Sequence, residues 1–114
     1  MKTIEALNKG TADVDLLRRC KQAIQKVTPE AEVILYGSRA RGDAQEDSDY
    51  DLMVVIDGPV DMALKKKIID YVYPLELESG AVLTLIVYNK QQWNLPPYRA
   101  MPLHKNVDRD GVLV

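Results

Sequence analysis

Two short stretches, Gly37-Ser38-Arg39-Ala40-Arg41-Gly42 and Asp49-Tyr50-Asp51, decide how this chain is interpreted. The first follows the apolar run Val33–Tyr36, and the second opens a nearly all apolar segment, Asp51–Ile56. Apolar, β-branched runs of this length predict strands. A glycine-serine turn therefore ends one strand, while two carboxylates stand at the entrance to another. The pattern predicts a phosphate-binding turn beside a metal-binding pair.

The turn has the residues that a phosphate site needs. Gly37 permits a sharp or left-handed turn and lets a ligand come close to the backbone. Ser38 is a favoured N-cap residue, and the residues after it can start a short helix whose first N–H groups suit a phosphate. The Ser38 hydroxyl would add one more hydrogen bond. On its own, such a turn is also common in proteins that bind no phosphate.

The two arginines of the turn have more than one interpretation. Arg39 and Arg41 could make charge-assisted contacts with a phosphate. They could equally face solvent or pair with Asp43 and Glu46.

The spacing of Gly37 and Gly42 also matches the start of a P-loop motif. That motif needs Lys and then Ser or Thr at the next two positions, where this chain has Asp43 and Ala44. We therefore reject the P-loop motif.

The spacing of the acids gives the turn its meaning. Side chains at i and i+2 of a strand lie on one face, roughly 6.6 Å apart along the chain. Asp49 and Asp51 can therefore converge on one metal, with Tyr50 pointing the other way and Ser48 placed to hydrogen-bond a carboxylate. Mg²⁺ binds one or two carboxylates and fills its other positions with water and phosphate oxygens. Two ions can share such a pair.

Composition limits the other possibilities. The 114 residues fit a single domain spanning 1–114. A net charge of −2 makes non-specific nucleic-acid binding a poor prospect, because that binding depends on Lys and Arg. The single cysteine, Cys20, predicts a buried thiol in a reducing cytoplasm. Apolar runs stay far below the ~20 residues that span a bilayer, so we expect no membrane.

Periodicity predicts an α/β (α+β) fold in which helices alternate with apolar strands. Pro74 is expected to interrupt the second long helix, and Leu75–Glu78 fits either a final helical turn or a short strand, with the helix favoured. Besides the two strands above, the predicted elements are a helix over Asp13–Val27, a helix from an Asp61 cap to about Val72, a strand over Val82–Tyr88, a turn of helix over Lys90–Trp93 capped by Asn89, and a helix over Pro102–Asp108.

Three further groups of residues have plainer interpretations. His104 is the single histidine and predicts a surface or satisfied structural position. Lys65–Lys67 predicts a solvated helix face. The aromatic residues of the second half predict core or interface contacts, and two of them near the Pro96-Pro97 pair could stack on a base; they are Tyr71, Tyr73, Trp93 and Tyr98.

The segment Gly37–Gly42 followed by Ser48–Leu52 resembles the signature of the minimal nucleotidyltransferases (MNT) of the DNA polymerase β-like superfamily. The end of the chain, Lys105–Val112, looks like that of other small members. The resemblance implies a nucleotidyltransferase fold, a small mixed β-sheet flanked by helices. It also implies transfer of a nucleoside monophosphate, often AMP from ATP, to a hydroxyl. Many bacterial members adjoin a helical HEPN protein, and some act as its antitoxin.

Carried onto this chain, the resemblance implies that Gly37 and Ser38 bind the β- and γ-phosphates. It implies that Asp49 and Asp51 bind Mg²⁺ as the catalytic acids. Active members usually have a third carboxylate on the later strand, and Thr84 stands there in our alignment. Thr84 can bind a metal weakly but cannot act as a base near neutral pH.

The missing acid leaves more than one function open. Glu76 or Glu78 could replace it if their segment folds over the site. The first hypothesis, with or without such a replacement, is a Mg-dependent nucleotidyltransferase acting on a protein or small-molecule hydroxyl. The alternative is a weak or inactive module that binds nucleotide or a partner, such as the antitoxin of a HEPN-type toxin, and a scaffold with a vestigial site is the third possibility. We expect a homodimer or a hetero-oligomer.

Overall fold

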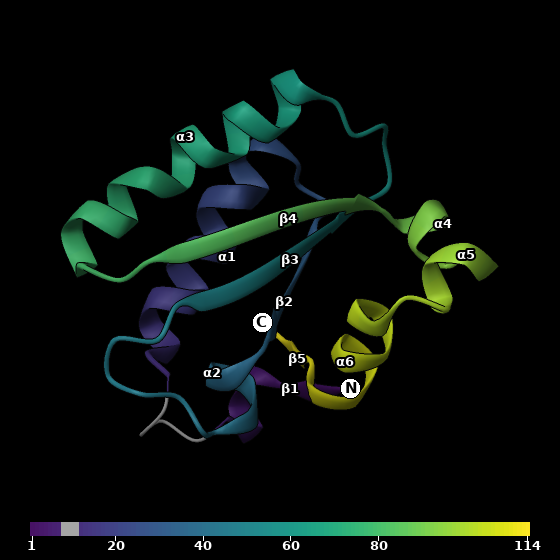
Figure 1. Ribbon diagram of the computed structural model, residues 1–114. Helices are drawn as coiled ribbons and strands as arrows, with labels where there is room; N and C mark the ends of the chain where they lie inside the picture. The colour runs from purple at the N-terminus through teal and green to yellow at the C-terminus, as the bar shows by residue number, and fades with distance from the viewer. Residues whose placement is uncertain (8–11) are drawn as a thin grey trace.

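The computed structural model describes residues 1–7 and 12–114 (Figure 1). The strands are β1 (Lys2–Thr3), β2 (Glu32–Tyr36), β3 (Tyr50–Ile56), β4 (Leu83–Asn89) and β5 (Val112–Leu113). The helices are α1 (Val14–Val27), α2 (Ser38–Arg41), α3 (Met62–Ser79), α4 (Lys90–Trp93), α5 (Pro96–Arg99) and α6 (Pro102–Asp110), with a 3-10 turn, η1, at Ile4–Ala6. The sequence did not predict β1, β5 or α5.

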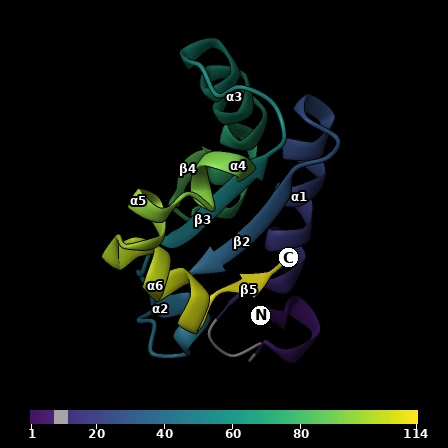
Figure 2. The ribbon, with the colours of Figure 1, turned by 90° about the vertical axis from the view of Figure 1, so that its right-hand side faces the viewer.

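Across the described residues the strands form one five-stranded sheet in the order β1-β5-β2-β3-β4. β3 is antiparallel to β2 and parallel to β4, so the sheet is mixed as expected. Figures 1 and 2 show α1 and α3 over one face of the sheet and the C-terminal helices at the other. The expected fold class is confirmed.

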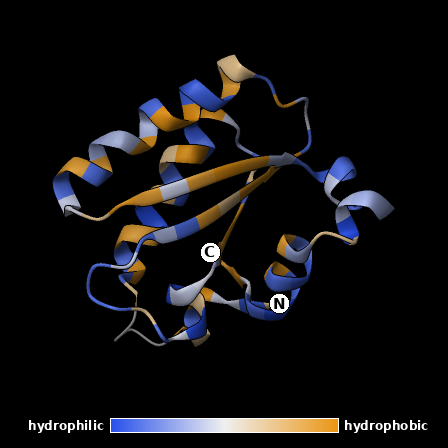
Figure 3. Ribbon diagram, in the orientation of Figure 1, coloured by the Kyte–Doolittle hydropathy of each residue, from blue (hydrophilic) through white to orange (hydrophobic). Residues whose placement is uncertain are grey.

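β3 lies between β2 and β4 and has a core on each side. Leu52, Val54 and Ile56 pack into the larger apolar core on the α1 and α3 face. Met53 and Val55 belong to a second core on the other face. Figure 3 shows the apolar character continuing along most of β3 and β4. The period-2 alternation therefore sends side chains into two cores, as expected for a central strand covered on both faces.

α1 forms as its pattern predicts. The Asp13 side chain accepts a hydrogen bond from the Leu16 N–H and caps the helix. Leu17, Cys20 and Ile24 are fully buried on one face. Burial raises the pKa of the Cys20 thiol to about 11, which leaves it protonated and unreactive.

α3 corrects one expectation. The Asp61 cap and the exposed Lys65–Lys67 face are as predicted, but the helix continues through Pro74 to Ser79 and ends at the left-handed Gly80. Pro74 faces solvent, where water can satisfy the carbonyl that its missing N–H leaves without a helical partner. No helix of the described residues has the length and apolarity to span a bilayer.

The second core explains the C-terminal aromatic residues. Trp93 and His104 are both buried and their rings stack, with centroids 4.2 Å apart. The His104 Nδ1 lies 3.0 Å from an Asp108 carboxylate oxygen. Its buried Nε2 has no hydrogen-bond partner among the described residues, so the expected satisfied position is met at one ring nitrogen alone. Tyr88 and Tyr98 pack edge to face beside them. Tyr71 and Tyr73, by contrast, are 45% and 53% exposed on α3, so the core interpretation is wrong for these two residues.

We expect Pro74→Ala to stabilise the protein. Alanine restores the helical N–H inside α3, where proline costs about 3 kcal/mol, and the gain is reduced by the looser unfolded chain. The free energy of unfolding, measured in urea, should rise by ~1–2 kcal/mol. Lys67→Ala, also exposed on α3, is the control and should leave it nearly unchanged. A loss of stability on Pro74→Ala would contradict this account of α3.

Candidate functional site

The turn between β2 and α2 is built around Gly37. Its φ of 74° and ψ of −158° lie in a region that is essentially restricted to glycine. Gly37 itself is the N-cap of α2, and its carbonyl accepts from the N–H groups of Ala40 and Arg41. Ser38 was predicted to cap this helix; it is instead the first helical residue, because the sharp bend falls one position earlier.

Asp51 lies directly against this turn. A Cβ added at Gly37 would collide with the Asp51 carboxylate, so only glycine lets the two strands bring them together. The register places Tyr36 on β2, Asp51 on β3 and Thr84 on β4 side by side across the sheet. Side chains at paired positions share a face. Asp51 therefore lies between the phenol group of Tyr36 on one side and the hydroxyl group of Thr84 on the other.

The charge of Asp49 reaches Asp51, while convergence of the two carboxylates on one metal stays a prediction. Burial raises the pKa of Asp51 above its ordinary value, the Asp49 charge raises it further, and Arg41 lowers it. Tyr50 between them points to the opposite face, where it is buried and its hydroxyl accepts from the Asp13 N–H at 3.0 Å. The Asp51 carboxylate thus lies beside the glycine turn and within electrostatic reach of Asp49, and a cation there would relieve their repulsion.

Arg39 holds the loop that carries Asp49. Its guanidinium donates to the Ser48 carbonyl at 2.8 Å and to the Glu46 carbonyl at 3.1 Å. The same group lies 4.4 Å from the centre of the Tyr50 ring. This contact with Glu46 is made to the backbone carbonyl, and so it differs from the charge pair that was one of the predicted alternatives. Ser48 does not bind a neighbouring carboxylate; its hydroxyl accepts from the Gln45 N–H.

Arg41 is placed between α2 and the end of α6. Its guanidinium donates to Asp43 at 3.1 Å and lies 4.0 Å from Asp110. The pairing with Asp43 was one of the predicted alternatives. Asp110 was not predicted, because the contact joins residues far apart in the sequence. A hydrogen bond from Arg109 lowers the pKa of Asp110, so its carboxylate stays ionised.

Tyr36 is a second residue that sequence reasoning missed. Burial raises the pKa of its hydroxyl, and the neighbouring Asp51 charge raises it further. Its position just before Gly37 was the available signal, since a strand residue pairs across the sheet with a residue of the next strand. Without the register, its partner could not be named.

Thr84 is exposed and occupies the position beside Asp51 that the alignment gave it. The proposed substitutes do not reach it. Glu76 accepts from the Leu83 N–H at the start of β4, and Glu78 pairs with Arg19 of α1 at 2.8 Å. Within residues 1–7 and 12–114, no three or more His, Cys, Asp and Glu side chains gather where they could hold a metal. The site has two acids.

The close approach of Gly37 and Asp51 predicts a specific coupling. Gly37→Ala should destabilise by ~1–3 kcal/mol through backbone strain, with a further cost from the collision. Gly42→Ala is the matched control, because Gly42 also has a positive φ but open space around it; strain alone should cost ~1–2 kcal/mol.

A double-mutant cycle in urea separates the two terms. Removing the carboxylate in Gly37→Ala/Asp51→Ala should recover the collision part, which gives a coupling of ~0.5–3 kcal/mol. Additive effects would show that the two residues do not meet. The same cycle with Gly42→Ala should give no coupling.

Comparison with known proteins agrees with this geometry. A sequence profile of the nucleotidyltransferase domain matches residues 15–106. Two proteins of Methanocaldococcus jannaschii, both named as candidate protein adenylyltransferases, are similar. One is 37% identical over 79 residues, covering 69% of this chain and 72% of the relative. The other is 29% identical over 79 residues, covering 68% and 80%.

A solved structure shows the same fold. A crystal structure of a toxin–antitoxin with AMP-PNP has a chain that superposes with a TM-score of 0.59 at 16% identity, covering 84% of this chain and 69% of that one. A candidate nucleotidyltransferase of Sulfolobus solfataricus gives 0.48 at 23% identity, covering 90% and 85%. The profile match and the 37% identical relative together show that this chain belongs to the nucleotidyltransferase domain family.

Proposed function

We propose that this protein transfers AMP from ATP to a hydroxyl group of a protein, with Mg²⁺ as cofactor. The observation that carries the proposal is the contact of Asp51 with the Gly37 turn, together with the electrostatic coupling of Asp51 to Asp49. The names of the two archaeal relatives support a protein as the acceptor. A nucleoside triphosphate would then lie with its phosphates between the turn and the acids.

The residues present fit magnesium. Carboxylates are the oxygen donors that Mg²⁺ prefers, and the phosphates and water would complete its coordination. Asp49 and Asp51 would hold one ion or share two. When bound, the ion would neutralise the phosphates and polarise the α-phosphate.

The chain itself would position the nucleotide. The backbone at Gly37 leaves room for close approach, and the Ser38 hydroxyl would donate to a phosphate oxygen. Arg41 would add positive charge at the edge of the turn, where it now pairs with Asp43. The acceptor hydroxyl oxygen would form the new bond to the α-phosphorus as the bond to pyrophosphate breaks. Its proton would leave to water, because Thr84 offers no base.

The first prediction concerns the acids. Asp49→Asn and Asp51→Asn should each lower adenylyl transfer by ~100-fold or more, since each removes a charge needed where phosphate charge develops. The assay is incubation with Mg²⁺, α-labelled ATP and a candidate helical acceptor protein, followed by mass spectrometry for one added AMP. Asp47→Asn, in the same loop and exposed, is the control and should transfer normally. Full transfer by both site variants would remove the assigned roles.

The second prediction concerns the position beside Asp51. Thr84→Asp should raise the transfer rate by ~10-fold or more, because a carboxylate there can accept the acceptor's proton and bind metal. Thr84→Asn has nearly the same size without the charge and should give no gain. If Thr84→Asp transfers AMP no faster than Thr84→Asn, removal of the acceptor's proton does not limit the reaction.

The missing carboxylate also favours a second function. With two acids only, the chain could hold Mg·ATP and a partner without turnover, as the antitoxin of a HEPN-type toxin. The toxin–antitoxin with AMP-PNP that shares this fold is the relevant precedent. If the Asp49→Asn variant still neutralises such a toxin, the chain acts as a binding module. If the variant loses both neutralisation and AMP transfer, the chain acts as an enzyme.

A further inference from the structure

The outer edge of β4 carries the next inference. In the part of the chain that the structure describes, β4 pairs with β3 alone and ends the sheet (Figure 1). Its seven residues, Leu-Thr-Leu-Ile-Val-Tyr-Asn, contain neither charge nor proline. Edge strands of soluble proteins are usually short, charged, bulged or covered, because an open edge pairs with other chains. β4 has none of the protections that its own sequence could provide.

The register shows which backbone groups point outward. The Tyr50 N–H donates to the Val82 carbonyl at 2.9 Å, so the even-numbered residues of β4 direct their hydrogen-bonding groups toward β3. The odd-numbered residues direct theirs away from the sheet. The outward N–H of Leu83 is already bonded to the Glu76 carboxylate. Leu85 and Val87 thus present a free donor and acceptor each at the centre of the edge.

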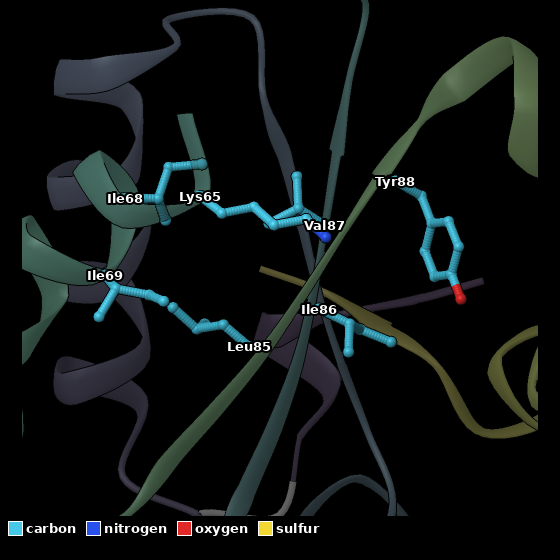
Figure 4. A pocket seen from close by; sticks show the side chains of 7 residues that line it. All are labelled: Lys65, Ile68, Ile69, Leu85, Ile86, Val87 and Tyr88. Carbon is cyan, nitrogen blue, oxygen red and sulfur yellow. The ribbon is translucent and has the colours of Figure 1, made fainter. Parts of the chain in front are cut away.

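An apolar stripe of α3 continues this edge upward. Met62, Ile69, Tyr73 and Leu77 are between 50% and 79% exposed, and their spacing of seven, four and four residues places them on one flank. Ile69 also lines a hollow with Leu85 and Val87, which fixes that flank on the β4 side. In Figure 4 the Ile69 and Leu85 side chains point toward one another between helix and strand.

We propose that two copies of this chain pair through β4, antiparallel and with Ile86 on the two-fold axis. Only odd-numbered residues can bond across the new edge, so odd must face odd. Among the registers that satisfy this rule, the one centred on Ile86 uses all seven residues. Leu85 of one copy then faces Val87 of the other, and these pairs exchange four backbone hydrogen bonds. The pairing does not depend on the reaction proposed above.

Charge favours a second copy as the occupant. An uncharged strand meets its own copy without like-charge repulsion. Above it, the Lys66 charge on α3 is balanced by Asp70 at 2.8 Å, so this pair adds no net charge to the surface. Lys65, which lines the hollow beside Leu85 and Val87, is the one positive charge close to the strand among the residues that line that hollow. One strand and one helix flank make a small interface. We therefore expect a weak dimer that forms at roughly micromolar concentration.

Sedimentation velocity tests the interface with a matched pair of variants. Ile69→Glu places a charge at the centre of the α3 stripe, while Tyr71→Glu places it on the opposite flank at similar exposure. Over ~5 to ~200 μM, the unmodified chain and Tyr71→Glu should shift from monomer to dimer, and Ile69→Glu should stay monomeric. A chain that remains monomeric throughout, or an Ile69→Glu variant that dimerises normally, overturns the proposal.

Amide hydrogen exchange reads the same pairing at the backbone. Among the described residues of one copy, the Leu85 and Val87 amides have no partner, so their slow exchange at high concentration would report the second copy. They should exchange at least ~10-fold faster in Ile69→Glu, while Thr84 and Ile86, bonded to β3, stay protected in both. Fast exchange of Leu85 and Val87 in a dimer places the contact elsewhere. If these amides become protected only when another protein is added, the β4 edge binds that protein and the proposed pairing of two copies is wrong.

A cysteine scan fixes the register. In Ile86→Cys, two-fold symmetry sets the new thiol opposite itself, with Cα atoms about 4.5 Å apart, inside the range of a disulfide. Mild oxidation should link most of this variant into a dimer. Thr84→Cys should link poorly, since its own copy lies roughly 14 Å away along the strand. The buried Cys20 does not compete. Equal linkage of both variants rejects the register.

Discussion

The close contact between the Gly37 backbone and the Asp51 carboxylate is the constraint on which the site depends. A side chain at position 37 would occupy the space of the Asp51 oxygen. The antiparallel pairing of β2 with β3 brings the turn and the acid together, and the parallel pairing with β4 adds Thr84 to the same row. The two-sided core of β3 holds this register in place. Chemistry and packing therefore meet at one strand.

Sequence alone predicted the parts of this fold that rest on local pattern. The apolar periodicity of α1 and the alternation in β3 need no distant partner to be recognised. The same holds for Gly37 and the acids at 49 and 51, because a bend and a spacing of two are local features. Pro74 shows the limit of local rules. Packing of α3 against the sheet outweighs the lost hydrogen bond, and the proline faces water, where that loss costs least.

Contacts between distant segments could not be predicted in this way. The place of Tyr36 beside Asp51 depends on strand register, and that of Asp110 near Arg41 depends on how α6 returns to the sheet. Glu76 and Glu78 could be ruled out as a third acid only after their partners, Leu83 N–H and Arg19, were known. The family resemblance implied that a third carboxylate should lie on the later strand. The strand register places Thr84 at that position, beside Asp51.

The hold of Arg39 on its loop has a thermodynamic consequence. Two carbonyls and the Tyr50 ring fix the guanidinium, and through it the segment leading to Asp49. The loop has therefore given up much of its conformational freedom during folding. A ligand that arrives at the acids meets a preorganised surface, and little ordering entropy is subtracted from its affinity. We therefore expect the ligand to bind to a rigid, preformed site, without ordering this loop as it binds.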